Sequence, residues 1–337
     1  MKNVLVTHAD LPLGRRIVKV LWHDPAVARI VAIGEGAVPR AFNSYRVGPA
    51  PRLVYERVDL ARQRSVSELF RSKRLRAIGV DSVVHVPRHG AGPEGPPVLA
   101  RVAARTAEAR HVLHFASESR SVEQLVAIGS AFVYRLTPGN ANHLTEESPL
   151  DLDPQVAPEL RTWIDCDMLF HAAVASPRLR VTLLRVPTVV ASGGYVYLHP
   201  GLEGAAGLRV RPAGFDPLCP VIADKDVALA VRAALGAGAG GIYNVAGRET
   251  LPLSVLGRWT RRPCVPVPGP LLRAASAAAA QLGNERLRSA LGGPYLRYGM
   301  SLDTARASSV LRFAPRYRVG VVRAGDGVQR LEAVASH

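Results

Sequence analysis

The chain has few of the cysteines that a disulfide framework or a metal–thiolate site would need. Its three cysteines, Cys166, Cys219 and Cys264, lie far apart in the sequence and have no paired spacing. Free thiols are typical of a reducing compartment. The first predicted strand begins at about residue 4, so we expect no secretory signal peptide before it. We therefore expect a cytoplasmic protein that binds no metal.

Long hydrophobic runs are also missing. No stretch of about 18 residues is free of charges and helix breakers, as a membrane-spanning helix requires. The nearest candidate, residues 271–283, is short and contains Arg273. This segment predicts a packed helix rather than a membrane span.

Lysine and aromatic residues are scarce, whereas arginine is abundant. The formal net charge is +16, and of the 43 basic residues only four are lysine. A positive surface favours an acidic protein partner or an anionic membrane surface. The basic residues are scattered and aromatics make up only 6% of the chain, so no stacking platform for bases is evident. We do not expect nucleic acid as a partner.

Hydrophobic residues make up 48% of the whole chain. Through its first half, short apolar runs alternate with helical patterns. The runs that predict strands are 3–7, 29–33, 53–58, 82–86, 124–128 and 180–186. The helical spacings are 14–23, 64–76, with Ser65 as its expected N-cap, 98–116 and 158–175. Continuous apolar strands that alternate with helices predict an α/β fold, a Rossmann-type doubly wound parallel sheet.

The regular alternation ends near residue 190. A helix at 226–238 and a strand at 241–247 are expected to return to the sheet, whereas 261–270 and the helical stretch to about 291 predict a smaller lobe. We assign residues 1–190 and 220–248 to a dinucleotide-binding-fold domain. Residues 191–219 and 249–330 are assigned to a smaller C-terminal lobe of the substrate-binding type.

Several motifs occur in an order that is similar to one enzyme superfamily. They are "VLVTHADLPLG" (4–14), "VDL" (58–60), "DSVVHV" (81–86), "GSAFVY" (129–134), "LLRVPTVVASG" (183–193) and "ADKDVALAV" (223–231). Together they resemble the extended short-chain dehydrogenase/reductases, the NAD-dependent epimerases and dehydratases. The resemblance covers about residues 3–315 and implies a cofactor, NAD or NADP.

The cofactor loop departs from that pattern. The resemblance places glycines at three positions, which here hold His8, Leu11 and Gly14. Gly14 retains the position that packs helix on strand, whereas the two that approach the pyrophosphate are lost. Pro12 removes a backbone donor, and Asp10 adds negative charge while suiting a helix N-cap. The loop predicts that no dinucleotide binds, although a shifted loop that still admits one is the alternative.

The remaining cofactor positions are mixed. An acidic residue is expected to end the second strand, but Gly34 lies there and Glu35 follows it. Small alanines that would line the channel are replaced by Pro87, Arg88 and His89, and Arg88 either contacts a phosphate or fills the vacated groove. The candidate cofactor residues, several of them vestigial, are Thr7, Leu13, Gly14, Asp59, His85 and Arg88.

The catalytic positions depart further. The resemblance implies a Ser, a Tyr that acts as acid and base, and a Lys four residues after the Tyr. Ser130 lies at the Ser position, but Trp163 and Asp167 stand at the Tyr and Lys positions and Arg105 replaces the supporting Asn. No Tyr-x-x-x-Lys occurs anywhere in the chain. Tyr134 is either a wall of the substrate cleft or a substitute acid.

These losses favour a non-catalytic protein, a pseudoenzyme that binds, scaffolds or regulates. The alternative is an active NAD(P)-dependent oxidoreductase or epimerase that acts on a nucleotide-sugar or lipid-like hydroxyl through a reshaped site. A third hypothesis is a regulator that still binds a dinucleotide. The resemblance also implies a homodimer formed through helices that include the one with Trp163, with Trp163 and Met168 either at that interface or in the core.

Overall fold

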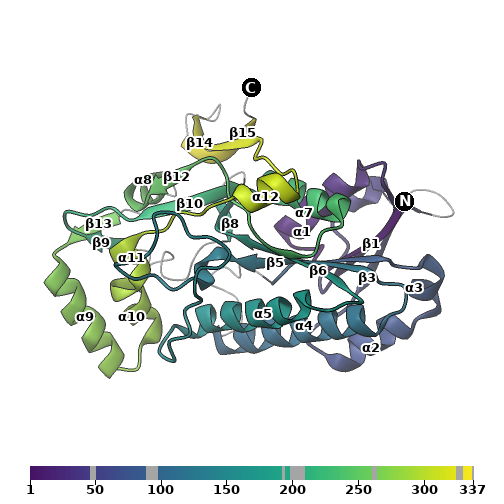
Figure 1. The fold of residues 1–337 in the computed structure, drawn as a ribbon, viewed down its shortest axis with the longest axis horizontal. Coiled ribbons are helices and arrows are strands. Elements are labelled where there is room, and N and C mark those ends of the chain that lie inside the picture. Colours follow the sequence, from purple (N-terminus) through teal and green to yellow (C-terminus); the bar gives the residue numbers. More distant parts are fainter. Residues whose placement is uncertain are drawn as a thin grey trace.

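A seven-stranded parallel sheet forms the centre of the molecule (Figure 1). The computed structural model describes residues 1–45, 51–88, 98–191, 194–197, 209–259, 264–323 and 329–335. The strand order is β11-β6-β5-β4-β1-β2-β3. Its strands are β1 Lys2–Val6, β2 Val27–Gly34, β3 Leu53–Arg57, β4 Ser82–His85, β5 Gln124–Ser130, β6 Arg180–Val186 and β11 Gly241–Asn244. The predicted α/β class and parallel sheet are confirmed.

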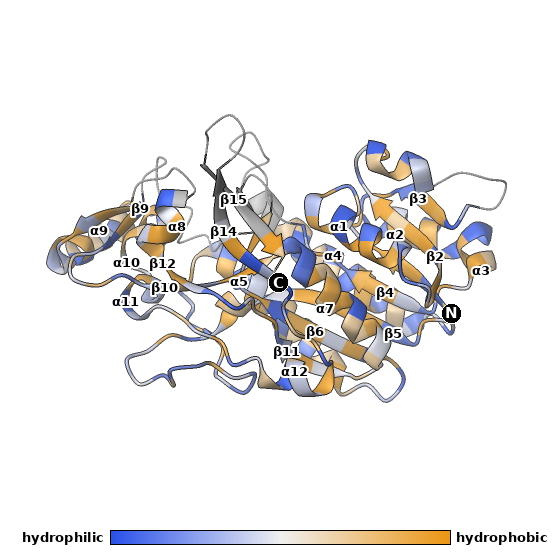
Figure 2. Ribbon diagram, turned by 90° about the horizontal axis from the view of Figure 1, so that it is seen from above, coloured by the Kyte–Doolittle hydropathy of each residue, from blue (hydrophilic) through white to orange (hydrophobic). Residues whose placement is uncertain are grey.

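Helices cover both faces of this sheet (Figure 1). On one face lie α1 Pro12–Trp22 and α7 Asp224–Ala237, and on the other lie α2 Gln63–Arg71, α3 Lys73–Ile78, α4 Val98–Glu118 and α5 Pro158–Val174. Successive residues of β1 point into different cores: Val4 and Val6 pack in one cluster and Leu5 in the other. Figure 2 shows hydrophobic residues concentrated along the strands and the helix faces toward them.

A smaller region with its own sheets lies beside the main sheet. Its four-stranded sheet has the order β12-β10-β7-β8, with β7 Thr188–Ala191, β8 Gly194–Tyr197, β10 Leu218–Ala223 and β12 Thr250–Pro252. Two further pairs are β9 Arg209–Pro212 with β13 Cys264–Val267, and β14 Tyr317–Arg323 with β15 Gln329–Ala335. Its helices are α8 Leu253–Trp259, α9 Gly269–Gln281, α10 Glu285–Gly292, α11 Pro294–Tyr298 and α12 Ala305–Val310. The domain boundaries assigned from the sequence remain predictions.

Two local predictions are wrong. The expected single helix at 64–76 is two helices, because Ser72 takes an extended conformation and its hydroxyl accepts a hydrogen bond from Leu75 N to cap α3. Ser65 is not an N-cap, since α2 begins earlier and its N-cap residue is Arg62, without a side-chain cap. In the described part of the chain, no helix is long and apolar enough to cross a membrane.

Candidate functional site

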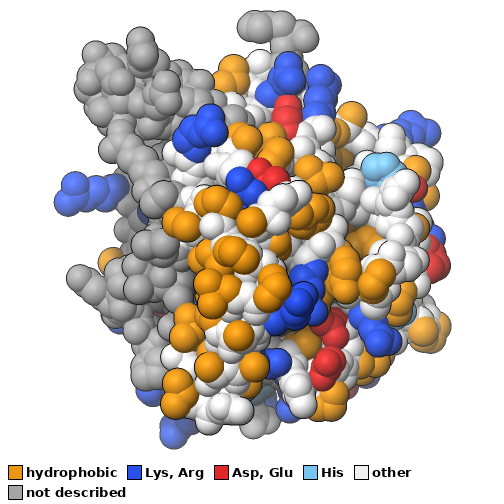
Figure 3. Space-filling view, turned by 90° about the vertical axis from the view of Figure 1, so that its left-hand side faces the viewer, with side chains coloured by type: hydrophobic (Ala, Val, Ile, Leu, Met, Phe, Trp, Pro, Cys, Tyr) orange, Lys and Arg blue, Asp and Glu red, His pale blue; other side chains and the backbone are white. Residues whose placement is uncertain are grey.

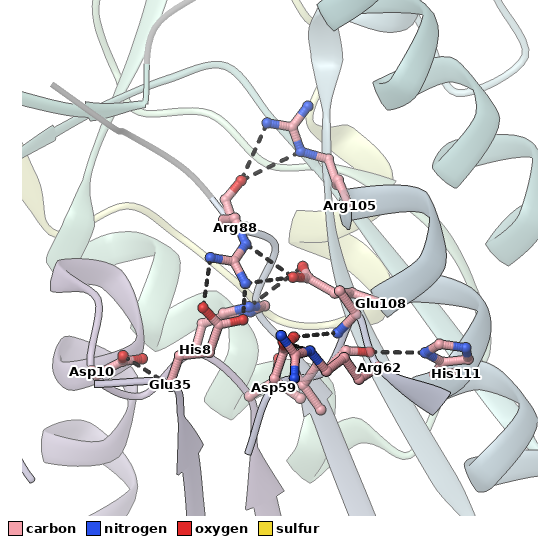
Figure 4. Close-up of polar contacts among 12 residues, drawn as sticks. His8, Asp10, Glu35, Asp59, Arg62, Arg88, Arg105, Glu108 and His111 are labelled. Atoms are coloured by element: carbon pink, nitrogen blue, oxygen red, sulfur yellow. Dashed lines mark hydrogen bonds and ion pairs between the residues drawn. The ribbon is translucent and has the colours of Figure 1, made fainter. Parts of the chain in front are cut away.

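The order in which successive strands are added to the sheet reverses between β1 and β4. We call the region at the carboxyl ends of these two strands the crevice. In open parallel sheets, ligands bind outside the carboxyl ends of the strands at such a point. Three charged residues follow the ends of neighbouring strands: His8 after β1, Glu35 after β2 and Arg88 after β4. The structure brings all three together, with Glu108 from α4 beside them (Figure 4).

In the loop after β1, His8 adopts a backbone conformation that glycine usually adopts. His8 has φ of 46°, in the left-handed region that an L-residue seldom adopts. Its Nδ1 lies 2.7 Å from the carbonyl oxygen of Val86, so the side chain crosses from β1 to the end of β4. A Cβ at Gly14 would overlap the carbonyl oxygen of His8 and lie 2.8 Å from Ala9 Cα. Gly14 therefore allows the close packing of α1 on this loop.

Asp10 is not the N-cap of α1. Leu11 holds that position and makes no side-chain cap. The Asp10 carboxylate instead accepts hydrogen bonds from the backbone N–H groups of Glu35, at 3.1 Å, and Gly36, at 2.8 Å. Glu35 and Gly36 follow the last residue of β2, and Asp10 accepts hydrogen bonds from their N–H groups. These bonds join the loop after β1 to the end of β2.

Arg88 lies at the centre of a crevice cluster that consists of His8, Glu35, Arg88 and Glu108 (Figure 4). Its Nε and Nη2 donate to Glu108 Oε1 at 2.9 and 2.7 Å, and its Nη1 donates to Glu35 Oε2 at 2.9 Å. Glu108 is fully buried, and its other oxygen lies 3.4 Å from Nε2 of His8. Arg88 thus bridges the two carboxylates, whereas His8 Nε2 and Glu108 Oε2 lie close together without a hydrogen bond among the described residues.

The electrostatics of the cluster follow from burial and these pairings. Burial would raise the pKa of Glu108, but His8 and Arg88 outweigh it and lower that pKa. Burial likewise opposes a charged His8, yet Glu108 and the Val86 carbonyl raise its pKa. For the neighbouring His85, burial and then repulsion from His8 outweigh the opposing effect of Glu108 and lower its pKa to about 3.

The same cluster offers the one group of close ligand atoms for a metal ion found among the described residues. The atoms belong to His8, Glu35 and Glu108 and lie within 4.8 Å of one another. Arg88 already donates to both carboxylates. A metal ion would have to displace this guanidinium, so the arrangement is better described as an ion-pair cluster.

The crevice residues differ from those that hold a pyrophosphate in a glycine-rich loop. A pyrophosphate needs glycine backbone and N–H groups free to approach it, whereas here the His8 ring and the buried Glu108 carboxylate occupy the crevice. Two carboxylates would repel its negative charge. Arg88 is paired with both carboxylates in this structure. Its two alternatives, a phosphate contact and a filled groove, remain predictions.

The other predicted cofactor residues have structural contacts. The Thr7 hydroxyl accepts from Val86 N at 2.9 Å and donates to Val86 O at 3.1 Å, which joins β1 to the end of β4. Leu13 is buried in the core. Asp59 accepts from Ala61 N and pairs with Arg62 at 3.0 Å, as a turn residue does. His89 lies outside the described residues.

The predicted catalytic residues are enclosed. Ser130 is fully buried at the end of β5 and accepts from Phe132 N at 3.1 Å. Trp163 belongs to the core, and the Arg105 guanidinium lies 4.2 Å from its ring centroid. Met168, on the same helix, is half exposed. The indole N–H of Trp163 does not release its proton at neutral pH, so Trp163 does not replace the Tyr that the resemblance implies.

Asp167 belongs to a buried polar network that the sequence analysis missed. Arg185 on β6 pairs with Asp167 and also donates to the Tyr134 hydroxyl at 2.9 Å. That hydroxyl donates to Asn244 at 2.6 Å, and Glu146 accepts from Asn244 N at 2.7 Å. The signal was an arginine inside the apolar run "TLLRV", since a buried cation needs an anion.

Tyr134 also lines a cavity between the main sheet and the smaller region. The cavity measures about 120 Å³ and its walls include Phe132, Leu160, Tyr295 and Asp151. Burial raises the pKa of Tyr134 to about 12, against the opposing effect of Arg185. A phenol with this pKa stays protonated at neutral pH, so Tyr134 does not act as a base there, and both alternatives for it, wall residue and substitute acid, remain predictions.

Comparisons with solved structures find NAD-dependent sugar-nucleotide enzymes over nearly the whole chain. A dTDP-glucose 4,6-dehydratase from Bacillus anthracis in complex with NAD is 14% identical, covers 94% of this chain and 92% of its own, and has a TM-score of 0.61. A dTDP-glucose 4,6-dehydratase from Streptomyces venezuelae with NAD bound is 18% identical, with coverage of 96% and 94% and a TM-score of 0.63. The UDP-glucuronic acid 4-epimerase from Bacillus cereus is 16% identical, covers 94% of each chain and has a TM-score of 0.61.

No protein-family model and no curated protein sequence matches the chain. The fold and the position of the crevice therefore define an α/β protein with the Rossmann-like architecture of the NAD-dependent epimerases and dehydratases. These structural neighbours confirm the fold that the resemblance implies. The crevice of this chain holds the cluster of His8, Glu35, Arg88 and Glu108.

Proposed function

We propose that the protein is a non-catalytic member of this fold that acts by binding, scaffolding or regulating rather than by hydride transfer. The observation that supports it is the crevice cluster, in which Arg88 joins Glu35 and Glu108 where a dinucleotide would lie. A second support comes from α5, which presents Trp163 and Asp167 in place of an acid–base pair. We propose that it works without a dinucleotide, and in the cytoplasm, where its buried free thiols Cys166 and Cys219 would stay reduced.

Thermal unfolding in the presence of NAD, NADH, NADP and NADPH tests this proposal. A ligand at a hundredfold excess over its dissociation constant stabilises a protein by about 2.7 kcal/mol, which a melting curve detects readily. We expect no shift with any of the four. A clear shift with one of them would contradict the proposal that no cofactor binds.

An opened variant makes the negative result informative. His8→Gly with Leu11→Gly restores the two glycines, and Glu108→Gln removes the buried negative charge that faces the pyrophosphate position. The triple variant should gain a thermal shift with NAD or NADP, provided that its unfolding transition remains cooperative. Arg64→Gln with Glu68→Gln, an exposed pair on α2, is the matched control and should gain none.

The second candidate is an active NAD(P)-dependent oxidoreductase or epimerase. It is favoured by the NAD that several structural neighbours bind and by Ser130, which ends β5 as the resemblance implies. Incubation with each dinucleotide and with dTDP- and UDP-sugars, followed by chromatography, separates the two proposals. A converted sugar that disappears in Ser130→Ala would favour the enzyme.

A further inference from the structure

The outer end of the smaller region exposes large apolar side chains. Leu271 near the start of α9 is 58% exposed, and Leu282, directly after α9, is 81% exposed. Phe215 and Tyr298 are each 40% exposed. Figure 3 shows hydrophobic side chains spread over this end of the molecule, with basic side chains and some acidic ones among them. Phe215 and Tyr298 line one hollow, and Leu271 and Leu282 lie at the two ends of α9.

Helix α9 adds a broad face of small apolar residues. The helix reads "GPLLRAASAAAAQ", and its only charged residue is Arg273. Four of its alanines are exposed: Ala274, Ala277, Ala278 and Ala280. The exposed side of α9 therefore consists mainly of small apolar side chains and contains no acidic group that would repel an anionic surface.

A hollow beside α9 contains two arginines without partners. It measures about 340 Å³, and its walls include Phe215, Leu272, Tyr298, Arg273 and Arg297. Within the described part of the chain, neither guanidinium forms a hydrogen bond or an ion pair, and both side chains are exposed. Among the described residues that line the hollow, none is acidic. Asp216, which follows the lining residue Phe215 in the sequence, accepts hydrogen bonds from Ser254 N and the Ser254 hydroxyl.

The charge of this part of the chain selects among possible occupants. Residues 250–302 contain seven arginines, one glutamate and no lysine or aspartate. A second copy would place the same cations against one another, which costs affinity. An anionic bilayer instead offers a uniform negative surface for arginines and an apolar layer directly beneath it.

We propose that this end of the molecule is a docking surface for anionic lipid. Arg273 and Arg297 take the headgroup phosphates in the hollow, while Leu271, Leu282 and the alanine face of α9 enter the interface. The arrangement is peripheral: the side chains that enter the bilayer come from one helix and its ends. This proposal does not depend on whether the crevice binds a dinucleotide.

Co-sedimentation of the full chain with vesicles tests the proposal. One set of vesicles contains phosphatidylcholine alone, and the other contains phosphatidylcholine with phosphatidylglycerol. We expect binding to the anionic vesicles that weakens with rising salt, and little binding to the neutral ones, because screening reduces the attraction of exposed charges. Glycerol 3-phosphate, added as a competitor, should release little protein, since it has the phosphate but no apolar part.

Paired variants test the residues. Arg273→Gln with Arg297→Gln should lower the vesicle partition coefficient at least tenfold, and Leu271→Ser with Leu282→Ser should lower it comparably. Arg71→Gln with Arg110→Gln is the charge-matched control, and Leu152→Ser with Met168→Ser is the apolar one, since all four residues are exposed elsewhere. Both controls should bind like the unmodified chain, and all variants should retain its melting temperature within a few degrees.

Three results would overturn the proposal. The first is no binding to anionic vesicles at low salt. The second is an equal loss of binding in the surface variants and their controls, which would reflect net charge alone. The third is a dimer in analytical ultracentrifugation that Leu271→Ser with Leu282→Ser dissociates while vesicle binding is unchanged, which would assign this surface to a second copy.

Discussion

The guanidinium of Arg185 donates two hydrogen bonds to the carboxylate of Asp167, at 2.8 Å from Nε to Oδ2 and at 2.7 Å from Nη2 to Oδ1. Both side chains are fully enclosed. The resemblance places a lysine at residue 167, where it would hold a nicotinamide ribose and stabilise a tyrosinate. In this chain the same position holds the counterion of an arginine on β6, so its contribution is to stability.

Loss of this counterion should destabilise the fold strongly. Asp167→Asn leaves Arg185 buried without an anion, and breaking a buried pair in this way costs about 3–5 kcal/mol. Asp167→Lys should be less stable still, because it places two cations in contact. Urea unfolding measures both changes. Asp165→Asn, which alters an exposed carboxylate one helix face away, should change stability by less than about 0.5 kcal/mol.

A side chain at residue 14 should not be tolerated. The Cβ of Gly14→Ala would overlap backbone atoms of His8 and Ala9, and overpacking against backbone costs about 1–3 kcal/mol or more. Gly236→Ala in α7 is the control, since no atom lies within 4 Å of its added Cβ. The control should gain about 0.5–1 kcal/mol through helix propensity. Equal effects on the unfolding free energy would contradict the proposed packing role of Gly14.

The backbone at residue 8 should prefer glycine to alanine. Both His8→Gly and His8→Ala lose the contact with Glu108, but only alanine retains the cost of a φ of 46°. The left-handed conformation costs an L-residue roughly 1–2 kcal/mol. We therefore expect His8→Gly to be more stable than His8→Ala by about 1 kcal/mol in chemical denaturation. The reverse order would show that the loop relaxes to negative φ.

Acid should weaken the fold partly through His85. Its folded-state pKa is lowered to about 3, mainly by burial and next by His8, whereas an unfolded histidine titrates near 6.5. Between these values the unfolded chain binds the additional proton, so stability falls as pH falls, by up to about 1.4 kcal/mol per pH unit. His85→Asn should reduce that slope in unfolding measured from pH 6.5 to pH 4. His171→Asn, an exposed histidine on α5, should leave it unchanged.

Much of the fold followed from local patterns. The apolar runs placed every strand of the main sheet up to β6 within two or three residues, because a strand covered on both faces needs an unbroken apolar stretch. The helix at 64–76 failed, since the Ser72 hydroxyl competes for backbone donors and interrupts the pattern. The alternation of apolar runs and helical patterns ends near residue 190 and did not predict the pairing of β14 with β15.

The sequence by itself determined the parallel α/β sheet, the retained Gly14, and the absence of a Tyr-x-x-x-Lys. Only the tertiary structure determined which charged side chains pair with one another. Glu108 lies in the middle of a long helix and Glu35 after a distant strand, and only folding brings them to Arg88. Hydrophobic periodicity is a short-range property that a single segment displays, whereas an ion pair depends on the distance between segments, which is set only when the helices pack on the sheet.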